Sequence, residues 1–206
     1  MMDSEIKKVL DKLEKQSALE KTKQLEIPSE DRMLAITMDT GKLLNMLLHM
    51  GRAQNVLEIG MSTGYSTIWM AEVVSKNNGK IITIEKNSKK IVRAKENFVS
   101  AGLMDAIEIK HGIAKEILSE MSNKEFKNYF DLVFMDADKE ECMNYFDLVL
   151  PMVKKNGLIV TDNMLFREKY RPEMQKFHEY VEKNLKVVSV TVPIGNGEEL
   201  TLKTEE

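Results

Sequence analysis

The sequence contains one cysteine and no long apolar run, and these absences exclude several classes of protein. Cys142 alone cannot form a disulfide within the chain. No apolar stretch approaches the roughly 20 residues that a membrane-spanning helix needs. The first residues, MMDSEIKKVLDKLEKQ, lack the apolar core of a signal peptide. We therefore expect a soluble cytoplasmic protein that does not enter a membrane.

An excess of charge of one sign is also missing. The 206 residues include 30 Lys and Arg and 33 Asp and Glu, interspersed along the chain, with a net charge of −3. Nucleic-acid-binding domains usually carry a strongly basic surface, so the overall charge does not indicate one, although it leaves a local basic patch open. The length and a hydrophobic content of 43% fit a single globular domain with a sizeable core.

The first 50 residues predict two helices. Residues 4–24 are highly charged but carry apolar residues at helical spacing, which indicates an amphipathic helix that needs a partner surface; a frayed tail is the alternative. Those apolar residues are Ile6, Val9, Leu10 and Leu13. The second helix is expected from Ser29, a plausible N-cap, to Met50, with Gly51 ending it and a break at Thr40-Gly41. This divides the chain into an N-terminal helical segment, residues 1–28, and a main domain, residues 29–206.

From Asn55 onward, short apolar strands alternate with helices, which is typical of a mostly parallel sheet covered on both faces. The expected strands are Asn55–Ile59, Lys80–Glu85, Ala106–His111, Asp131–Asp136 and Leu158–Asp162. The expected helices are Ser66–Val74, Ser88–Ala101, Ala114–Met121, Glu140–Leu150 and Pro172–Asn184. Two β-rich runs, Lys186–Pro193 and Glu199–Lys203, flank Gly195-Asn196-Gly197 and predict a terminal hairpin. The fold class is therefore α/β.

A glycine-punctuated turn, EIGMSTGYS at residues 58–66, follows the first expected strand, where open α/β sheets bind ligands. Its G-x-x-x-G spacing lacks the glycine that lets a dinucleotide pyrophosphate approach the backbone, which argues against NAD. Glu58 suits an ammonium group, and Glu85 at the end of the second strand suits a ribose diol. A purely structural turn and a solvated strand end are the alternatives. The order of strand, turn, helix, strand and acid favours a nucleoside site, and S-adenosylmethionine fits it best.

Three oxygen-bearing side chains follow the fourth and fifth expected strands. Asp136 ends the fourth strand, and Asp162 and Asn163 end the fifth, so neighbouring strands would bring them to one edge of the sheet. Two carboxylates that close repel each other unless a cation lies between them. An all-oxygen set selects magnesium, manganese or calcium, of which we favour magnesium. Helix capping is the alternative, and we prefer it for Asp138.

Lys139 lies three residues after Asp136, at an expected helix start and near the expected cation. Both influences would lower its pKa and suit it to act as a general base, whereas without the metal it would be an ordinary surface lysine. The histidines are scattered, and Cys142 has no obvious base nearby, so neither indicates a site. Those histidines are His49, His111 and His178.

The segments VLEIGMSTGYS, DLVFMDADK and LIVTDNMLF, taken in this order, resemble the cation-dependent O-methyltransferases, the group that includes catechol and caffeoyl-CoA O-methyltransferases. The resemblance runs from about Leu34 to Lys203, and the final VPIGNGEELTLK is similar to the closing hairpin of the bacterial and archaeal branch. It implies a Rossmann-like class I S-adenosylmethionine-dependent methyltransferase fold, with N-terminal helices and a seven-stranded, mostly parallel sheet whose last strand is antiparallel. It also implies a homodimer, for which the amphipathic N-terminal segment and the hairpin offer surfaces.

The same resemblance assigns the site residues. The metal ligands are Asp136, Asp162 and Asn163, and Lys139 is the candidate base, with Asp136 as its catalytic partner. The cofactor residues are Glu58, Gly60, Ser62 and Ser66 at the methionine end, Glu85 at the ribose, Gly112, Ile113 and Ala114 at the adenine, Asp136, and Ile36 on the N-terminal helix. Two features depart from catechol-specific relatives: Ala137 and Asp138 replace aromatic or imidazole residues, and the segment Met164–Arg171 is short.

The expected acceptor is a small catechol-like or other hydroxylated aromatic molecule. The second hypothesis is a tRNA wobble uridine with a 5-oxygen substituent, whose phosphates would contact three basic residues beside the metal site. Those residues are Arg167, Lys169 and Arg171. A third is a catalytically silent, dimeric nucleoside-binding module, which the intact Asp136, Lys139, Asp162 and Asn163 argue against. A nicotinamide dehydrogenase is weakened by the glycine spacing.

Overall fold

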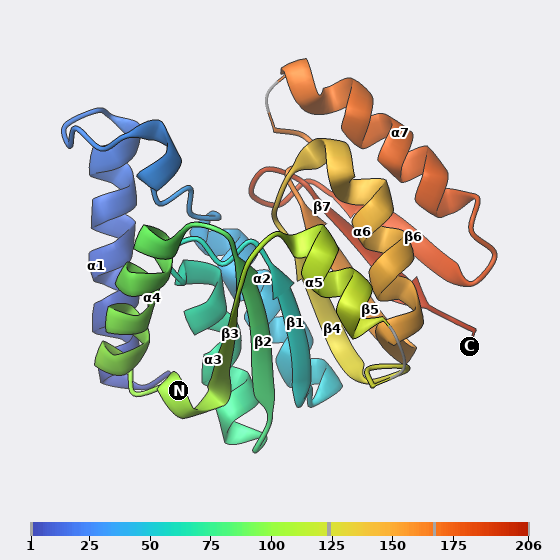
Figure 1. Cartoon of the computed structure of the whole chain (residues 1–206), viewed down its shortest axis with the longest axis horizontal. Coiled ribbons are helices and arrows are strands. Elements are labelled where there is room, and N and C mark those ends of the chain that lie inside the picture. Colours follow the sequence, from blue (N-terminus) through green and yellow to red (C-terminus); the bar gives the residue numbers. More distant parts are fainter. Residues whose placement is uncertain (1, 123–124, 167, 206) are drawn as a thin grey trace.

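The computed structural model describes residues 2–122, 125–166 and 168–205. In these residues seven strands form one sheet in the order β3-β2-β1-β4-β5-β7-β6 (Figure 1). The strands are β1 Asn55–Ile59, β2 Lys80–Glu85, β3 Ile107–His111, β4 Phe130–Met135, β5 Val153–Asp162, β6 Val187–Val192 and β7 Glu198–Lys203. Strands β1 to β5 pair in parallel, and β7 runs antiparallel to both β5 and β6. The prediction of a mostly parallel sheet with an antiparallel last strand is confirmed.

Helices cover both faces of the sheet. They are α1 Ser4–Lys21, α2 Met38–Gly51, α3 Tyr65–Lys76, α4 Ser88–Ser100, α5 Ala114–Met121, α6 Cys142–Val149 and α7 Arg171–Glu182. One apolar core lies between the sheet and α1 to α4, and a second lies between the sheet and α5 to α7. The central strand β1 alternates between them, with Val56 in the first core and Leu57 in the second, as a strand buried on both faces requires. No helix in the described residues is both long and apolar enough to span a bilayer.

The amphipathic helix expected in the first residues is confirmed as α1, and its apolar face packs inside the same molecule. Its buried residues Ile6, Leu10 and Leu13 join the first core, where α1 contacts α3 and α4. At the end of α1, Glu20 is buried and accepts hydrogen bonds from Met33 N–H, at 2.6 Å, and from Arg93, at 3.0 Å. The apolar face of α1 is therefore covered without a second subunit.

The second helix begins later than predicted. Residues 29–31 form a single 3-10 turn, residues 32–37 are not helical, and α2 starts only at Met38. Thr37, not Ser29, is the N-cap, because its hydroxyl accepts the Thr40 N–H at 3.1 Å. The expected break at Thr40-Gly41 is also wrong, since α2 runs through it. Gly41 is needed for packing, because a Cβ there would lie 2.5 Å from the Trp69 ring.

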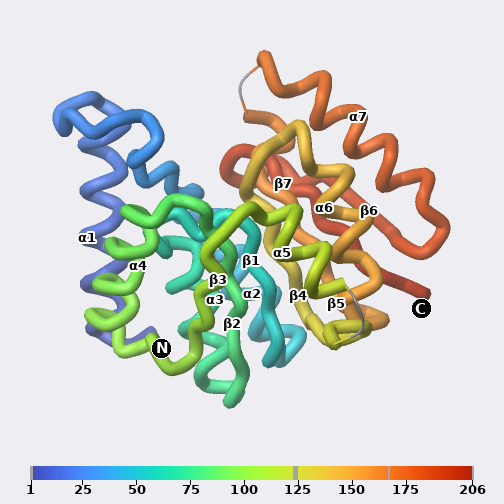
Figure 2. The backbone as a smooth tube through the Cα atoms, viewed as in Figure 1, coloured from blue at the N-terminus to red at the C-terminus, as the bar shows by residue number. Residues whose placement is uncertain are grey.

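The connection between α1 and α2 lies against the turn that follows β1, and Figure 2 traces its path. The Ser62 hydroxyl donates to the Met33 carbonyl oxygen. Asp31 accepts hydrogen bonds from Asn87, at 3.0 Å, and from Lys89, at 2.8 Å, at the start of α4. Residues 29–37 are thereby tied to the carboxyl ends of β1 and β2.

We predict that α1 is an integral part of the folded domain. Replacing Leu13, which is 1% exposed, with Ala should lower the free energy of unfolding by about 2–5 kcal/mol, because it leaves a cavity in the core. Urea unfolding followed by circular dichroism measures this change. Leu19→Ala, on the exposed side of the same helix, is the matched control and should have little effect. Equal, small effects of both substitutions would contradict the prediction.

Candidate active site

The glycine turn after β1 lies directly against the end of β4. Gly60 has a φ of +97°, and a Cβ there would lie 2.1 Å from the Asp136 carbonyl oxygen. The Asp136 N–H donates to the Ile59 carbonyl oxygen at 2.9 Å. Only glycine satisfies both the backbone conformation and this approach. The structure therefore brings together the two motifs that predict a nucleoside site and a metal site.

Glu85, at the end of β2, faces the same turn. Its carboxylate accepts the Ser62 N–H at 2.8 Å and the Asn87 N–H at 2.9 Å. The Glu85 carbonyl oxygen accepts the Gly112 N–H at 3.0 Å, so the turn that starts α5 is adjacent. In that turn Ile113 is 53% exposed. The residues predicted for the ribose and the adenine, Glu85 and Gly112 to Ala114, are thus neighbours.

Ile36 does not lie on a helix, which corrects the prediction. It belongs to the non-helical residues 32–37, because the helix cap is at Thr37, and its side chain is only 6% exposed, within the first core. The connection that contains Ile36 contacts the glycine turn at Met33, whose carbonyl oxygen accepts a hydrogen bond from the Ser62 hydroxyl.

Glu58 lies inside the domain, where its carboxyl group is fully enclosed by hydroxyl groups. Thr67 and Thr83 each donate to it at 2.6 Å, and Ser66 donates to its other oxygen. Burial raises the pKa of Glu58 to about 7, against these hydrogen bonds, which lower it. The side chains of Glu58 and Ser66, both predicted to line a ligand, are therefore hydrogen-bonded to each other. Through its three hydroxyl donors, Glu58 on β1 is linked to α3 and β2.

The predicted metal ligands and the predicted base form one cluster. Asp136 Oδ1 accepts from Lys139 Nζ at 3.1 Å and from Asn163 Nδ2 at 2.8 Å. Asp162 is 1% exposed, and its Oδ1 accepts the Asn163 N–H at 2.6 Å. Asn163 has a φ of +76°, a conformation that Asn tolerates better than most residues. Asp138 instead caps the following turn, accepting the Glu140 N–H at 3.2 Å, which confirms its predicted role.

The pKa of Lys139 is raised in the protein alone, whereas the predicted fall refers to the site with a cation bound and stays a prediction. Burial lowers the pKa of Lys139, but the negative charges of Asp136 and Asp162 together raise it by more, so the net shift is upward. The expected fall depended on a positive charge nearby, and the chain itself supplies two negative ones. In the protein alone, Lys139 is therefore an ammonium group that balances Asp136.

A residue that the sequence did not indicate, Glu198, completes this cluster. It lies on β7 directly opposite Asp162 in the antiparallel pairing with β5 and is 0% exposed. Thr40 donates to its Oε1 at 2.9 Å, whereas no N–H or hydroxyl group of the described residues donates to its Oε2. Burial raises the pKa of both carboxyl groups, and so does nearby negative charge, that of Asp136 for Asp162 and that of Asp162 for Glu198. A hydrogen bond between the two carboxyl groups raises the pKa of Glu198 and lowers that of Asp162, which places a shared proton on Glu198. The sequence carried one signal for such a residue: Glu198 and Glu199 are adjacent in a strand, so their side chains must point to opposite faces of the sheet.

The donor atoms around Asp136 suit a hard divalent cation. No three His, Cys, Asp or Glu side chains of the described residues already form a ligand set. Asp136, Asp162 and Asn163 nevertheless supply oxygens only, as magnesium or manganese prefers. Asn163 Oδ1 accepts from Asn196 at 3.4 Å, and rotating the amide would present this oxygen to a cation bound beside Asp136. The unpaired buried Glu198 Oε2 is a further atom that a cation would satisfy.

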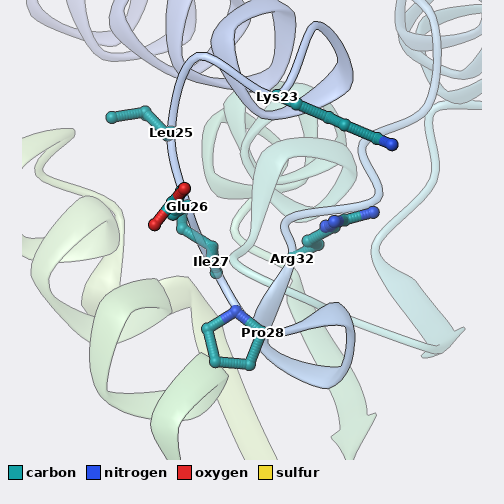
Figure 3. A pocket seen from close by; sticks show the side chains of 6 residues that line it. All are labelled: Lys23, Leu25, Glu26, Ile27, Pro28 and Arg32. Atoms are coloured by element: carbon teal, nitrogen blue, oxygen red, sulfur yellow. The ribbon is translucent and has the colours of Figure 1, made fainter.

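Two surface hollows lie away from this cluster. One of about 430 Å³ is lined by Lys23, Leu25, Glu26, Ile27, Pro28 and Arg32 (Figure 3). Figure 3 shows Lys23 and Arg32 extending to the same side of the connection that follows α1. The other, of about 630 Å³, is lined by α1 residues and Leu25. None of their lining residues belongs to the predicted site, and their acidic and basic side chains are mixed.

Comparison with known proteins supports the resemblance. An O-methyltransferase family model matches residues 4–204. Catechol O-methyltransferase of Niastella koreensis is 38% identical over 64% of this chain and 59% of its own length. Caffeoyl-CoA O-methyltransferase 1 of Eucalyptus globulus is 34% identical over 65% of this chain and 54% of its own length. These alignments thus span little more than half of each relative.

A solved structure extends the similarity to nearly the whole fold. The O-methyltransferase TomG from Streptomyces achromogenes, solved in complex with SAM, superposes with a TM-score of 0.79 at 26% identity. The superposition covers 99% of this chain and 91% of that one. The resemblance inferred from the three sequence motifs is confirmed.

We predict that Glu58 makes the stability of the domain depend on pH. Because its pKa is raised from 4.5 to about 7, the folded protein holds the proton more tightly, and this stabilisation is lost as pH rises through that window. Glu58→Gln, which cannot ionise, should gain about 2–3 kcal/mol relative to wild type between pH 5 and pH 8. Urea unfolding at both pH values measures the difference. A constant difference would show that Glu58 is ionised throughout.

Proposed function

Because the chain belongs to the O-methyltransferase family, we propose that it transfers a methyl group from S-adenosylmethionine to a hydroxyl group with the help of a divalent cation. The observation that carries this proposal is the contact between Gly60 and Asp136. It joins a turn suited to a nucleoside to an oxygen-rich cluster suited to a cation. A methyl donor in the turn and an acceptor at the cluster would meet at this junction.

The proposed cofactor site follows the glycine turn. Glu85 accepts two backbone N–H groups and keeps lone pairs for a ribose diol. Gly112, Ile113 and Ala114 border the adenine, and the backbone from Gly60 to Ser66 borders the methionine end, together with Asp136 and Ile36. Glu58 and the Ser66 hydroxyl act here by holding the turn in place. The SAM complex of TomG, with its similar fold, supports this assignment.

The proposed reaction uses the acidic cluster to prepare the acceptor. Asp136, Asp162 and Asn163 would hold magnesium, or manganese or calcium in its place. The cation, when bound, acts as a Lewis acid that lowers the pKa of the acceptor hydroxyl. Lys139, at 3.1 Å from Asp136, is placed to receive the proton once its own pKa is lowered by a neighbouring positive charge. The products would be a methyl ether and S-adenosylhomocysteine.

The acceptor that we favour is a small catechol-like or other hydroxylated aromatic molecule, in keeping with the names of the relatives. Ala137 and Asp138 offer no aromatic packing, so such an acceptor would be held chiefly through its oxygen atoms. A silent nucleoside-binding module is disfavoured, because Lys139 and Asn163 both donate hydrogen bonds to Asp136 in one cluster. A dimer stays a prediction, supported by β6, where Val188 and Val190 are 64% and 54% exposed.

A tRNA wobble uridine is the second candidate acceptor. Lys169 and Arg171 are exposed and follow Asn163 closely in the chain, and Lys169 lies 4.4 Å from the centre of the Tyr170 ring. Arg167 lies outside the described residues. A methyl-transfer screen that includes both catechols and undermodified tRNA distinguishes the two acceptors, and a salt-sensitive gel shift with tRNA would favour the second.

We predict that Glu85 carries much of the cofactor affinity. Glu85→Ala should weaken S-adenosylmethionine binding by about 1.5–3 kcal/mol, or roughly ten- to a hundredfold, because charge-assisted hydrogen bonds to the ribose are lost. Isothermal titration calorimetry measures the affinity. Glu108→Ala, on the neighbouring strand β3, is the control and should bind like wild type. Unchanged affinity in Glu85→Ala would show that Glu85 does not bind the ribose.

We predict that methyl transfer requires a divalent cation at Asp162. Asp162→Asn should abolish transfer to a catechol while leaving cofactor affinity within a few-fold of wild type, since the cation prepares the acceptor and not the donor. A chelator should have the same effect, and magnesium or manganese should reverse it. Asp138→Asn, two residues from Asp136 on an exposed turn, should stay active. Full activity in chelator would exclude the metal-dependent mechanism.

A further inference from the structure

Glu198 is a buried carboxyl group that the proposed reaction does not yet use. It is 0% exposed, as is its neighbour Glu199, but the two side chains have different surroundings. Glu199 accepts hydrogen bonds from Ser189, Thr191 and His178, the last at 3.0 Å. Glu198 points to the opposite face of β7, where the Thr40 hydroxyl donates to its Oε1 and no other hydroxyl or N–H group of the described residues reaches it. One strand thus carries one fully satisfied carboxyl and one with an unpaired oxygen.

The unpaired oxygen lies beside another buried carboxyl. Glu198 and Asp162 are direct partners in the antiparallel β5–β7 register, so their side chains share a face, with Cβ atoms about 5 Å apart. Two carboxyls this close and this deeply buried must share a proton or hold a cation between them. Lys139 donates its hydrogen bond to Asp136, and no N–H or hydroxyl group of the described residues donates to Glu198 Oε2. The carboxyl of Asp162 is within hydrogen-bonding reach of Glu198, so a shared proton occupies the place that a cation would take.

The surrounding chain fixes Glu198 in this position. Thr40, in the first turn of α2, bonds Oε1 at 2.9 Å and leaves Oε2 as the free oxygen. Two backbone hydrogen bonds join the residues after β5 to the loop before β7. The Met164 N–H donates to the Gly197 carbonyl oxygen at 2.9 Å, and the Leu165 N–H donates to the Asn196 carbonyl oxygen at 2.8 Å. Asp162, Asn163 and Glu198 are therefore held together by backbone pairing, as a preorganised ligand set requires.

We propose that Glu198 is a further oxygen ligand of the divalent cation, with Oε2 joining Asp136, Asp162 and Asn163. The proposal rests on the metal-dependent function inferred above. When the cation displaces the proton of this buried pair to the solvent, Glu198 becomes a third carboxylate, which raises the negative charge of the site and hence its affinity for a hard cation. Thr40 is then a positioning residue, which acts on the cation through Glu198.

The test is the affinity for Mn²⁺ alone, measured by isothermal titration calorimetry with the whole 206-residue chain and no acceptor. Glu198→Gln keeps the shape of the side chain and an acceptor for Thr40 but removes the charge, and it should weaken Mn²⁺ binding about tenfold or more. Glu199→Gln, an equally buried neighbour on the other face, is the matched control and should bind within twofold of wild type. Circular dichroism in chelator verifies that both variants are folded.

A second variant keeps the proposal testable if Glu198→Gln does not fold. Thr40→Val retains Glu198 but removes the hydrogen bond to Oε1, and it should also weaken Mn²⁺ binding, by a few-fold. Wild-type Mn²⁺ affinity in folded Glu198→Gln, or in Thr40→Val where only that variant folds, would overturn the inference while leaving the metal-dependent function intact. Failure of the wild-type protein itself to bind Mn²⁺ would overturn that function and this inference together.

Discussion

The backbone of Gly60 touches the carbonyl group of Asp136, and the proposed site depends on that contact. A side chain at residue 60 would separate the ends of β1 and β4, since its Cβ would lie 2.1 Å from the oxygen. With glycine there, the turn that ends at Ser66 and the cluster that begins at Asp136 share one edge of the sheet. Separation by even one side chain would place the donor and acceptor regions too far apart for direct transfer.

In the other half of the site, the acidic side chains differ in whether a lysine lies nearby to balance their charge. Asp136 is balanced by Lys139, and Asp131, at the opposite end of β4, by Lys154 at 2.6 Å. Asp162 and Glu198 have no such partner in the described chain, although both are almost fully buried. Two neighbouring carboxyl groups are rarely buried without a proton or a cation, so this pair needs one or the other to be stable.

The parallel part of the fold could be predicted from sequence because its signals are local. Asp136 and Asp162 follow apolar runs, and the carboxyl ends of neighbouring parallel strands meet at one edge. The start of α2 was missed because both Ser29 and Thr37 can cap a helix, and only tertiary contacts select Thr37. The surroundings of Glu58 depend on Thr67 and Thr83 from two other elements.

The position of Glu198 was missed for a related reason. Which of two adjacent glutamates faces the cluster is set by the β5–β7 register, which depends on the loop before β7. The direction of the Lys139 pKa depends on which charges lie around it, and the sequence does not show that the two carboxylates dominate in the protein alone.

The hydrogen bonds through Met33 connect the glycine turn to the distant helix α1. Its carbonyl oxygen accepts the Ser62 hydroxyl, and its N–H donates to Glu20, which Arg93 also holds. A small molecule that immobilises Ser62 therefore also restrains Met33 and, through it, the last turn of α1. By thermodynamic linkage, such occupancy should be visible as slower amide hydrogen exchange in α1, far from any atom that the ligand touches.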